Sequence, residues 1–398
     1  MSWSTVRADQ FCTLITDGTH DSPKPQQSGW KLITSKHLKG HYIDFDSANW
    51  ISEADYLKVI SRSAVEQWDI LFSMIGTIGN IYLEKNPHVE YACKNMGIFK
   101  FSGNKENALW MYYYLKSPQA KAYIQTHLRG STQAYVPLGG LREMPVPVPS
   151  QSVRNEIIAI LRPIDEKIEC NNAINDNLMQ QAVTIFKSWF VEYSPFDGIE
   201  PKEWETVNLE KITSLISRGI APKYSDNSDQ IVINQKCIRN HMIDLSQART
   251  HTPKVINEKW LRFGDLLINS TGDGTLGRAA QVWFQPQNIT VDSHVTVVRP
   301  AKENLIFYIG LWGVLHEREI ESLHTGSTGQ TELPKERVKA LELHLPDNGT
   351  LDRFNTLIAP MAAAIVSKQN ENNKLATLRD ALLPKLMSGE IDVSAVQL

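Results

Sequence analysis

Four short polar segments occur in the first half of this 398-residue chain and again in the second half. They carry lysines, arginine, amides and short hydroxyls next to glycine turns or strand-like runs. Lysine and arginine suit anionic groups, and amides and hydroxyls can bond both a phosphate and the edge of a base. This is the chemistry of nucleic-acid contacts. The candidate residues are Lys36, Gly76, Thr77, Lys94, Asn95, Ser131, Thr132, Gln133, Gln235, Lys236, Thr275, Arg278, His294, Ser327, Thr328 and Gln330.

Each segment also has a purely structural interpretation. Lys36 and Lys236 fit solvated residues at strand ends, and the glycine turns fit tight hairpins without a ligand. The polar residues before the strand-like runs at 97–101 and 295–299 fit caps or turns. The hydroxyl segment at 130–133, with its counterpart at 326–330, favours a binding role most strongly, because hydroxyls and a glutamine together can bond phosphate and adenine.

The elements that position these segments are also duplicated. Trp3-Ser4-Thr5-Val6 returns as Trp204-Glu205-Thr206-Val207, and Asp69-Ile70-Leu71-Phe72 returns as Asp265-Leu266-Leu267-Ile268. The period of about 200 residues exceeds the roughly 20–50 residues of a solenoid unit. It is the length of a domain plus a connector. We therefore expect a pseudo-two-fold dimer within one chain, with a target in two parts.

A long helical pattern follows each globular repeat. Apolar positions alternate in steps of four and three, as in the seam of a coiled coil, and the second series repeats the first at a shift of 197 residues. Polar residues occupy the middle of both seams, at Asn171 and Asn175 and at Lys368 and Asn372. Matched prolines, Pro163 and Pro360, predict a kink or a restart of each helix. The alternative is a pair of ordinary amphipathic helices.

Composition and motifs exclude several classes of protein. Hydrophobic content is 42%, charged content is 21% and the formal net charge is −3, which fits a globular protein. No run approaches the ~20 apolar residues of a membrane span, and the four cysteines show no paired spacing. The sequence contains no phosphate-binding Gly-x4-Gly-Lys-Ser/Thr loop and no Asn/Asp-Pro-Pro-Tyr/Phe motif of an amino-methyltransferase. We therefore expect a cytoplasmic protein that is not an enzyme by itself and binds no metal.

The order of repeat, helix, repeat and helix resembles the specificity subunit of type I DNA restriction–modification systems. The run Asp17-Gly18-Thr19-His20-Asp21-Ser22-Pro23 is similar to one that recurs in the target-recognition domains of that family. The resemblance adds His20 to the candidate DNA contacts. The second repeat departs from the run: Arg218-Gly219-Ile220 keeps the glycine and lacks the histidine.

The resemblance implies an α+β fold with two α/β target-recognition domains and two long antiparallel coiled-coil helices. It places the first domain at 1–149, the central helix at 150–194, the second domain at 195–345 and the last helix at 346–398. Each domain would recognise one half of a bipartite, asymmetric DNA site, and the helices would set the spacer between the halves.

The same resemblance implies the partners, which are double-stranded DNA, two methyltransferase subunits, and restriction subunits that translocate DNA. S-adenosylmethionine, ATP and Mg²⁺ are expected in those partners, with no cofactor bound by this chain. We expect the helices to expose apolar seam residues as the docking surface for the methyltransferases. These residues are Ile185, Phe186, Trp189, Phe190, Leu382 and Leu386.

Two other functions compete with this one. A structural adaptor built on a coiled coil would explain the helices alone. A self-contained modification enzyme would need a methyltransferase domain, for which this pattern leaves no room. The base sequence recognised does not follow from the residues, since it depends on loop geometry.

Overall fold

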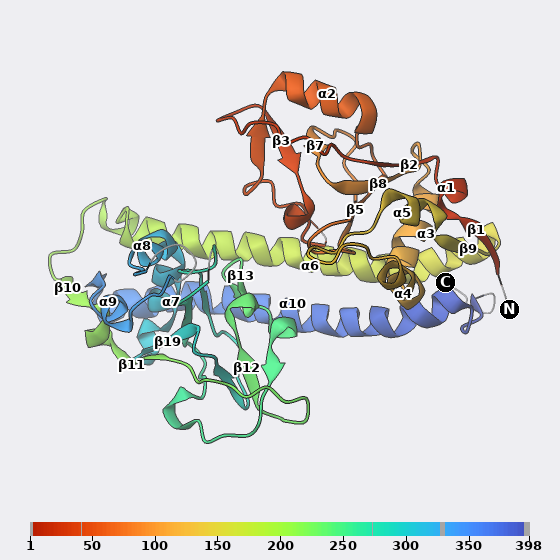
Figure 1. The fold of residues 1–398 in the computed structure, drawn as a ribbon. Coiled ribbons are helices and arrows are strands. Elements are labelled where there is room, and N and C mark those ends of the chain that lie inside the picture. Colours follow the sequence, from red (N-terminus) through yellow and green to blue (C-terminus); the bar gives the residue numbers. More distant parts are fainter. Residues whose placement is uncertain (1–2, 41, 273, 327–330, 394–398) are drawn as a thin grey trace. The chain divides into compact units, whose positions relative to one another are not determined.

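The computed structural model describes residues 3–40, 42–272, 274–326 and 331–393. The chain forms two compact units, one of residues 1–169 together with 373–398, and one of residues 170–372. Figure 1 shows the two long helices and the mixed helix–sheet parts attached to them. Each unit combines sheets, short helices and a segment of both long helices, so the predicted α+β class is confirmed.

The described residues of the first unit form three small sheets. A four-stranded antiparallel sheet has the order β2-β8-β5-β6, a three-stranded sheet has the order β4-β3-β7, and β1 pairs with β9. The elements are β1 (Ser4–Arg7), α1 (Ala8–Phe11), β2 (Leu14–Asp17), β3 (Trp30–Ile33), η1 (Ser35–His37), β4 (Asn49–Ile51), α2 (Glu53–Ser63), β5 (Ile70–Ser73), β6 (Ile81–Leu83), β7 (Tyr91–Cys93), β8 (Met96–Lys100), α3 (Lys105–Lys116), α4 (Pro118–Thr126), α5 (Leu138–Glu143) and β9 (Pro145–Val148).

The second unit repeats this topology. Its sheets have the orders β11-β19-β16-β17 and β15-β12-β18, β10 pairs with β20, and β13 pairs with β14. The elements are η2 (Ser194–Phe196), β10 (Glu205–Asn208), η3 (Leu209–Ile212), β11 (Thr213–Arg218), β12 (Ile231–Ile233), η4 (Gln235–Cys237), β13 (Ile238–Arg239), β14 (Met242–Ile243), η5 (Leu245–Gln247), β15 (Arg249–Thr250), η6 (Asn257–Lys259), β16 (Leu266–Asn269), β17 (Ala279–Gln281), β18 (Ile289–Val291), β19 (Val295–Pro300), η7 (Glu303–Leu305), α7 (Ile306–Leu315), α8 (Glu317–Ser322), α9 (Lys335–Lys339) and β20 (Glu342–Leu345).

The duplicated glycines Gly18 and Gly219 are required by close backbone packing. A Cβ at Gly18 would lie 2.3 Å from the carbonyl oxygen of Cys93, and one at Gly219 would lie 2.0 Å from that of Val291. Any other residue would push apart the strand ends that meet there. The glycine is therefore retained where the neighbouring histidine is not.

The duplicated aspartates Asp69 and Asp265 form buried ion pairs. Lys100 Nζ lies 2.9 Å from Asp69 Oδ2, and the Arg299 guanidinium binds both oxygens of Asp265 at 2.8 and 2.7 Å. Burial raises the pKa of the Asp69 carboxyl, although Lys100 opposes this shift. Loss of one partner of such a pair typically costs about 3–5 kcal/mol, so we assign both aspartates a structural role.

Helices α6 (Gln151–Phe190) and α10 (Asn348–Ser388) are continuous over 40 and 41 residues. Neither Pro163 nor Pro360 interrupts its helix, so the predicted restart is wrong. The contacts show that the helices are antiparallel, as predicted. Asn171 Nδ2 donates to Asn372 Oδ1 at 2.8 Å, whereas Asp165, earlier in α6, accepts from Arg379, later in α10, at 2.9 Å.

The polar positions of the two seams meet in one layer. Asn171 is fully buried, also donates to Glu371 at 2.9 Å, and lies 3.4 Å from Lys368 Nζ. Asn372 in turn donates to Asn172 at 2.8 Å. A buried polar layer specifies register, because a slip of either helix would leave these groups unpaired.

The expected exposed apolar strip is wrong for Phe186, Phe190 and Leu386, which are only 1%, 7% and 1% exposed. Phe186 and Phe190 pack in the core of the second unit against Tyr308 and Phe354. Ile185, Trp189 and Leu382 are half-buried at the edges of the two cores.

A drift of the buried face explains this error. The seam predicted from the sequence runs here through Leu178, Ala182, Ile185 and Trp189. Ala182 is buried as predicted, but the other buried residues are Met179, Phe186 and Phe190. A straight α-helix has 3.6 residues per turn and drifts ~20° per heptad from a 3.5-residue repeat. Near the end of α6, the residues that follow Leu178, Ile185 and Trp189 therefore face the core of the second unit.

The end of α10 belongs to the first unit. Leu383, Leu386 and Met387 lie in the same buried cluster as Ile157 and Leu161 of α6. Arg379 and Lys116 of α3 both pair with Asp165, at 2.9 and 3.1 Å. Burial raises the pKa of the Asp165 carboxyl, but the two cations outweigh it and lower that pKa on balance.

Candidate nucleic-acid interface

Three candidate segments of the first unit lie at one end of its four-stranded sheet. The sheet is antiparallel, so the end of β2, the start of β8 and the end of β5 share one edge. His20 follows β2, Lys94 and Asn95 precede β8, and the turn at 76–79 follows β5. The pairing of these strands therefore brings three of the candidate polar segments together.

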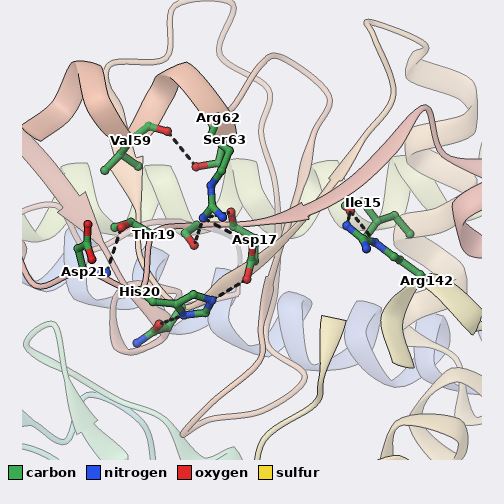
Figure 2. Close-up of polar contacts among 11 residues, drawn as sticks. Ile15, Asp17, Thr19, His20, Asp21, Val59, Arg62, Ser63 and Arg142 are labelled. Carbon is green, nitrogen blue, oxygen red and sulfur yellow. Dashed lines mark hydrogen bonds and ion pairs between the residues drawn. The ribbon is translucent and has the colours of Figure 1, made fainter. Parts of the chain in front are cut away.

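Hydrogen bonds tie this edge together. The His20 ring contacts Asp17 Oδ2 through Nε2 and Asn95 Oδ1 through Nδ1, both at 2.8 Å. Figure 2 shows the ring of His20 and the guanidinium of Arg62 converging on Asp17, which lies 3.6 Å from Arg62. The His20 side chain is nonetheless 67% exposed, so the cluster is open to a ligand. Lys94 donates to the hydroxyl of Ser22.

The remaining candidates of the first unit border the same turn. Thr77 Oγ1 donates to the carbonyl of Ser35 at 3.5 Å, which brings η1 and its exposed Lys36 to the turn. Arg129 and Tyr135 exchange backbone hydrogen bonds of 2.9 Å and so close a hairpin-like loop. Tyr135 also forms a bridge with Ile75, beside Gly76. The loop presents the exposed residues Ser131, Thr132 and Gln133.

Thr271 connects the candidate segments of the second unit. Its hydroxyl lies 2.8 Å from Nδ1 of His294 and 3.4 Å from Oε1 of Gln235. Its backbone forms a bridge with Glu332, which pairs in turn with Thr325. Three predicted segments thus meet at Thr271, as does the stem of the fourth. Ser327, Thr328 and Gln330 themselves lie outside the described residues.

The other candidates of the second unit are placed as follows. Lys236 is exposed on η4, next to Gln235. Arg278 donates to the carbonyl of Gly274 at 2.8 Å, and Thr275 Oγ1 donates to that of Gly272 at 3.2 Å. The pair β16–β17 is antiparallel around this turn, so the predicted hairpin is confirmed. The positions of these residues do not test whether they contact DNA. Their assignment to DNA binding stays a prediction.

The two units place an imidazole at the same sheet edge from different strands. In the first unit, His20 follows β2. In the second unit, Ala221 holds that position, since Gly219 matches Gly18, and His294 supplies the ring from the residue before β19. The backbone N–H of His294 donates to Asp292 Oδ1 at 2.9 Å, and burial raises the pKa of this carboxyl. Both units therefore have a histidine at this sheet edge, but the two histidines come from different segments of the repeat.

A pair of cations was missed by the sequence comparison. Arg62 donates to the carbonyl of Gly18 at 3.0 Å, and Lys259 donates to that of Gly219 at 3.1 Å. Each fixes the backbone beside the duplicated glycine. They come from unlike elements, α2 and η6, so no alignment of the repeats would have matched them. The spacing of Asp17 and His20, three residues apart, was the available signal for the Asp17 contact.

Within the described part of the chain, no group of three or more His, Cys, Asp and Glu side chains is placed to hold a metal ion. None of its helices is long and apolar enough to cross a membrane.

Comparison with known proteins identifies the class to which this duplicated fold belongs. The family model of the type I restriction modification DNA specificity domain matches residues 3–180 and again residues 201–359. The two matches cover more than half of the chain, each including one set of sheets. The chain belongs to this family and contains two of its domains.

Individual relatives agree with this assignment. The type I restriction enzyme MjaIX specificity subunit of Methanocaldococcus jannaschii is 26% identical over 390 residues, which cover 91% of this chain and 86% of that protein. The HindI specificity subunit of Haemophilus influenzae is 20% identical over 416 residues, which cover 86% and 90%. The crystal structure of a type I restriction-modification S subunit from M. genitalium has the same fold, with a TM-score of 0.53 at 13% identity and coverage of 97% of this chain and 96% of that one.

Proposed function

We propose that this chain is the DNA sequence-specificity subunit of a type I restriction–modification system and has no catalytic role of its own. Two family domains within one chain carry this proposal. Each domain gathers exposed hydroxyl, amide and cationic groups at one sheet edge, which suits recognition of bases and phosphates. Each domain would therefore bind one half of a bipartite, asymmetric DNA site.

The partners proposed are two methyltransferase subunits and restriction subunits, in the cytoplasm, with S-adenosylmethionine, ATP and Mg²⁺ bound by those partners. Helices α6 and α10 would carry the docking surface. Because Phe186, Phe190 and Leu386 are buried in their own units, that surface has to use half-buried and exposed residues of the helices. Ile185, Trp189 and Leu382 remain available for it.

The direct test is reconstitution of the chain with its methyltransferase partner. We expect selection from a randomised DNA library to yield two short conserved half-sites separated by a fixed, non-specific gap. Methylation of a host genome should occur at the same bipartite sequence. A complex that retains DNA without preference would support the structural-adaptor alternative, and methyl transfer by the chain alone would support a self-contained enzyme.

Gln133 and Lys36 are expected to respond differently to alanine substitution. Loss of a bidentate base contact in Gln133→Ala should relax one base position by about 1–3 kcal/mol. Lys36→Ala should weaken all sequences alike and lower the slope of log affinity against log salt by about one, because one phosphate contact is lost. Binding measured at several salt concentrations on matched and mismatched sites separates the two effects. A uniform loss in Gln133→Ala would remove its proposed role in base recognition.

The helices provide a second prediction, about the gap between half-sites. Both α6 and α10 pass between the units without interruption. Seven residues added to each, after Glu169 and after Asn372, keep the heptad phase and add about 10 Å. We expect the preferred gap to grow by about three base pairs, since B-DNA rises about 3.4 Å per pair.

The matched control for this experiment adds the same seven residues after Gly198, an exposed position beyond α6. It should leave the gap unchanged, because Phe186 and Phe190 keep α6 packed in the second unit. An unchanged gap in the helix variant as well would assign the spacing to the partner subunits.

A further inference from the structure

A cation binds the same backbone carbonyl in each of the two units. Arg62 Nη2 donates to the carbonyl of Gly18 at 3.0 Å, and Lys259 Nζ donates to that of Gly219 at 3.1 Å. These matched glycines follow β2 and β11, the strands that end at the candidate sheet edge of each unit. Figure 2 shows the Arg62 guanidinium reaching this backbone from α2, beside Asp17. The two units therefore share this contact, although one cation lies on a helix and the other on η6.

In the first unit, the buried ion pair of Lys100 and Asp69 fixes the segment that carries Arg62. Lys100 Nζ donates to the carbonyl of Ala64 at 2.9 Å, as well as to Asp69. Ala64 is the C-cap of α2 and lies two residues after Arg62. The buried pair therefore sets the position of Arg62 independently of its contact with Gly18.

In the second unit, the equivalent ion pair of Arg299 and Asp265 fixes the segment that carries Lys259. The Arg299 guanidinium donates to the carbonyls of Glu258 and Trp260, on either side of Lys259, at 2.9 and 2.7 Å. Trp260 lies five residues before Asp265, as the residue bound by Lys100 lies five residues before its own aspartate. The two cations therefore lie on equivalent segments, one position apart in the aligned repeats.

Each cation keeps hydrogen-bond donors that the protein does not use. A guanidinium has five N–H donors and an ammonium has three. Nε and Nη1 of Arg62 have no hydrogen-bond partner among the described residues, and the side chain is 58% exposed. Lys259 is half-buried and forms no ion pair with any described carboxylate. Asp17 lies 3.6 Å from Arg62, but the second unit has Arg218 at the position of Asp17, so an anion at this position is not common to the two units.

We propose that Arg62 and Lys259 each bind a DNA phosphate while they hold the backbone from which the following loop starts. This inference rests on the proposed function and adds one phosphate contact to each half-site. A neutral donor would suffice for a peptide carbonyl, so the charge that both units retain is explained by an anionic ligand. Because phosphates carry no sequence information, each contact would set the register of its domain on the duplex and would not select bases.

Substitution by glutamine separates the phosphate contact from the contact with the glycine carbonyl. Glutamine keeps an N–H that can donate to the carbonyl, and it removes the charge. In the methyltransferase complex, Arg62→Gln and Lys259→Gln should each lower the slope of log affinity against log salt by about one, and the double variant by about two. At about 0.1 M salt, each single variant should bind DNA roughly tenfold more weakly. The factor should be the same for the bipartite site and for sites with one mismatched base pair.

Two further variants are the controls. Arg62→Lys gives the first unit the type of cation that the second unit uses, and it should retain the wild-type slope. Arg7→Gln removes another cation of the first unit, whose side chain is 50% exposed and pairs with Asp9. Arg7 ends β1, which pairs only with β9 among the described strands and is not part of the four-stranded sheet. Its loss should leave the slope unchanged.

The outcomes separate this inference from the proposed function. A wild-type complex that binds all sequences alike overturns the proposed function itself. A selective wild type whose slope is unchanged in both glutamine variants overturns the phosphate contacts. A loss of base preference at an unchanged slope also overturns them and leaves the two cations with a positioning role alone. If Arg62→Gln does not fold, Lys259→Gln still tests the same contact in the other domain.

Discussion

Replacement of residues 1–149 with the same domain of a relative is expected to change one half of the DNA site and leave the other half intact. The two units have separate cores and separate sheet edges, so the loops of one do not depend on those of the other. Each base pair of the original half-site that the graft no longer recognises should cost about 1–3 kcal/mol of binding free energy. Methylation profiling of a host carrying the hybrid measures both halves at once.

The hybrid has to preserve the packing of the first domain on the helices. Trp110 and Val146 lie in the same buried cluster as Ile157 and Leu161 of α6, so the donor domain needs apolar residues at these positions. The reciprocal graft of residues 195–345 is the control, and it should change only the other half-site. A change in both half-sites by either graft would contradict independent recognition.

Leu386→Ala, near the end of α10, is expected to destabilise the N-terminal domain. The side chain is 1% exposed within the core of the first unit, and truncation of such a leucine typically costs about 2–5 kcal/mol. Hydrogen exchange should accelerate in β8 of the first unit and remain slow in β19 of the second.

Leu378→Ala is the matched control on the same helix, since this leucine is 49% exposed. Its effect should stay within about 0.5 kcal/mol. Faster exchange in β19 than in β8 after Leu386→Ala would contradict the assignment of the helix end to the first unit.

The duplication could be predicted because several matched residues occupy positions at which few other residue types would fit. Gly18 and Gly219 permit a close approach of strands, and Asp69 and Asp265 hold buried cations. Such constraints persist in both repeats and are visible in a single sequence. The polar positions in the middle of the two seams were also visible in the sequence, and the structure shows that Asn171 and Asn372 meet in one layer.

Other features were not accessible from the sequence. A heptad pattern shows that α10 has an apolar face, but it does not say which domain the last turns of that helix cover. The movement of the imidazole from His20 to His294 involves two strands that meet only in the folded sheet. The role of Thr271 likewise depends on contacts with residues 23 and 36 positions away.

The return of α10 to the first unit has a consequence for the order in which the protein folds during synthesis. Domains of a multidomain chain usually fold in order from the N-terminus as they leave the ribosome. Here Leu383, Leu386 and Met387 are made only after residues 170–372, which contain the whole second unit, yet they complete the core of the first unit. At about 5–20 residues per second, the roughly 200 intervening residues take about 10–40 s to translate. During that interval an apolar surface of the first unit stays uncovered. The second unit is therefore the one that can finish folding first.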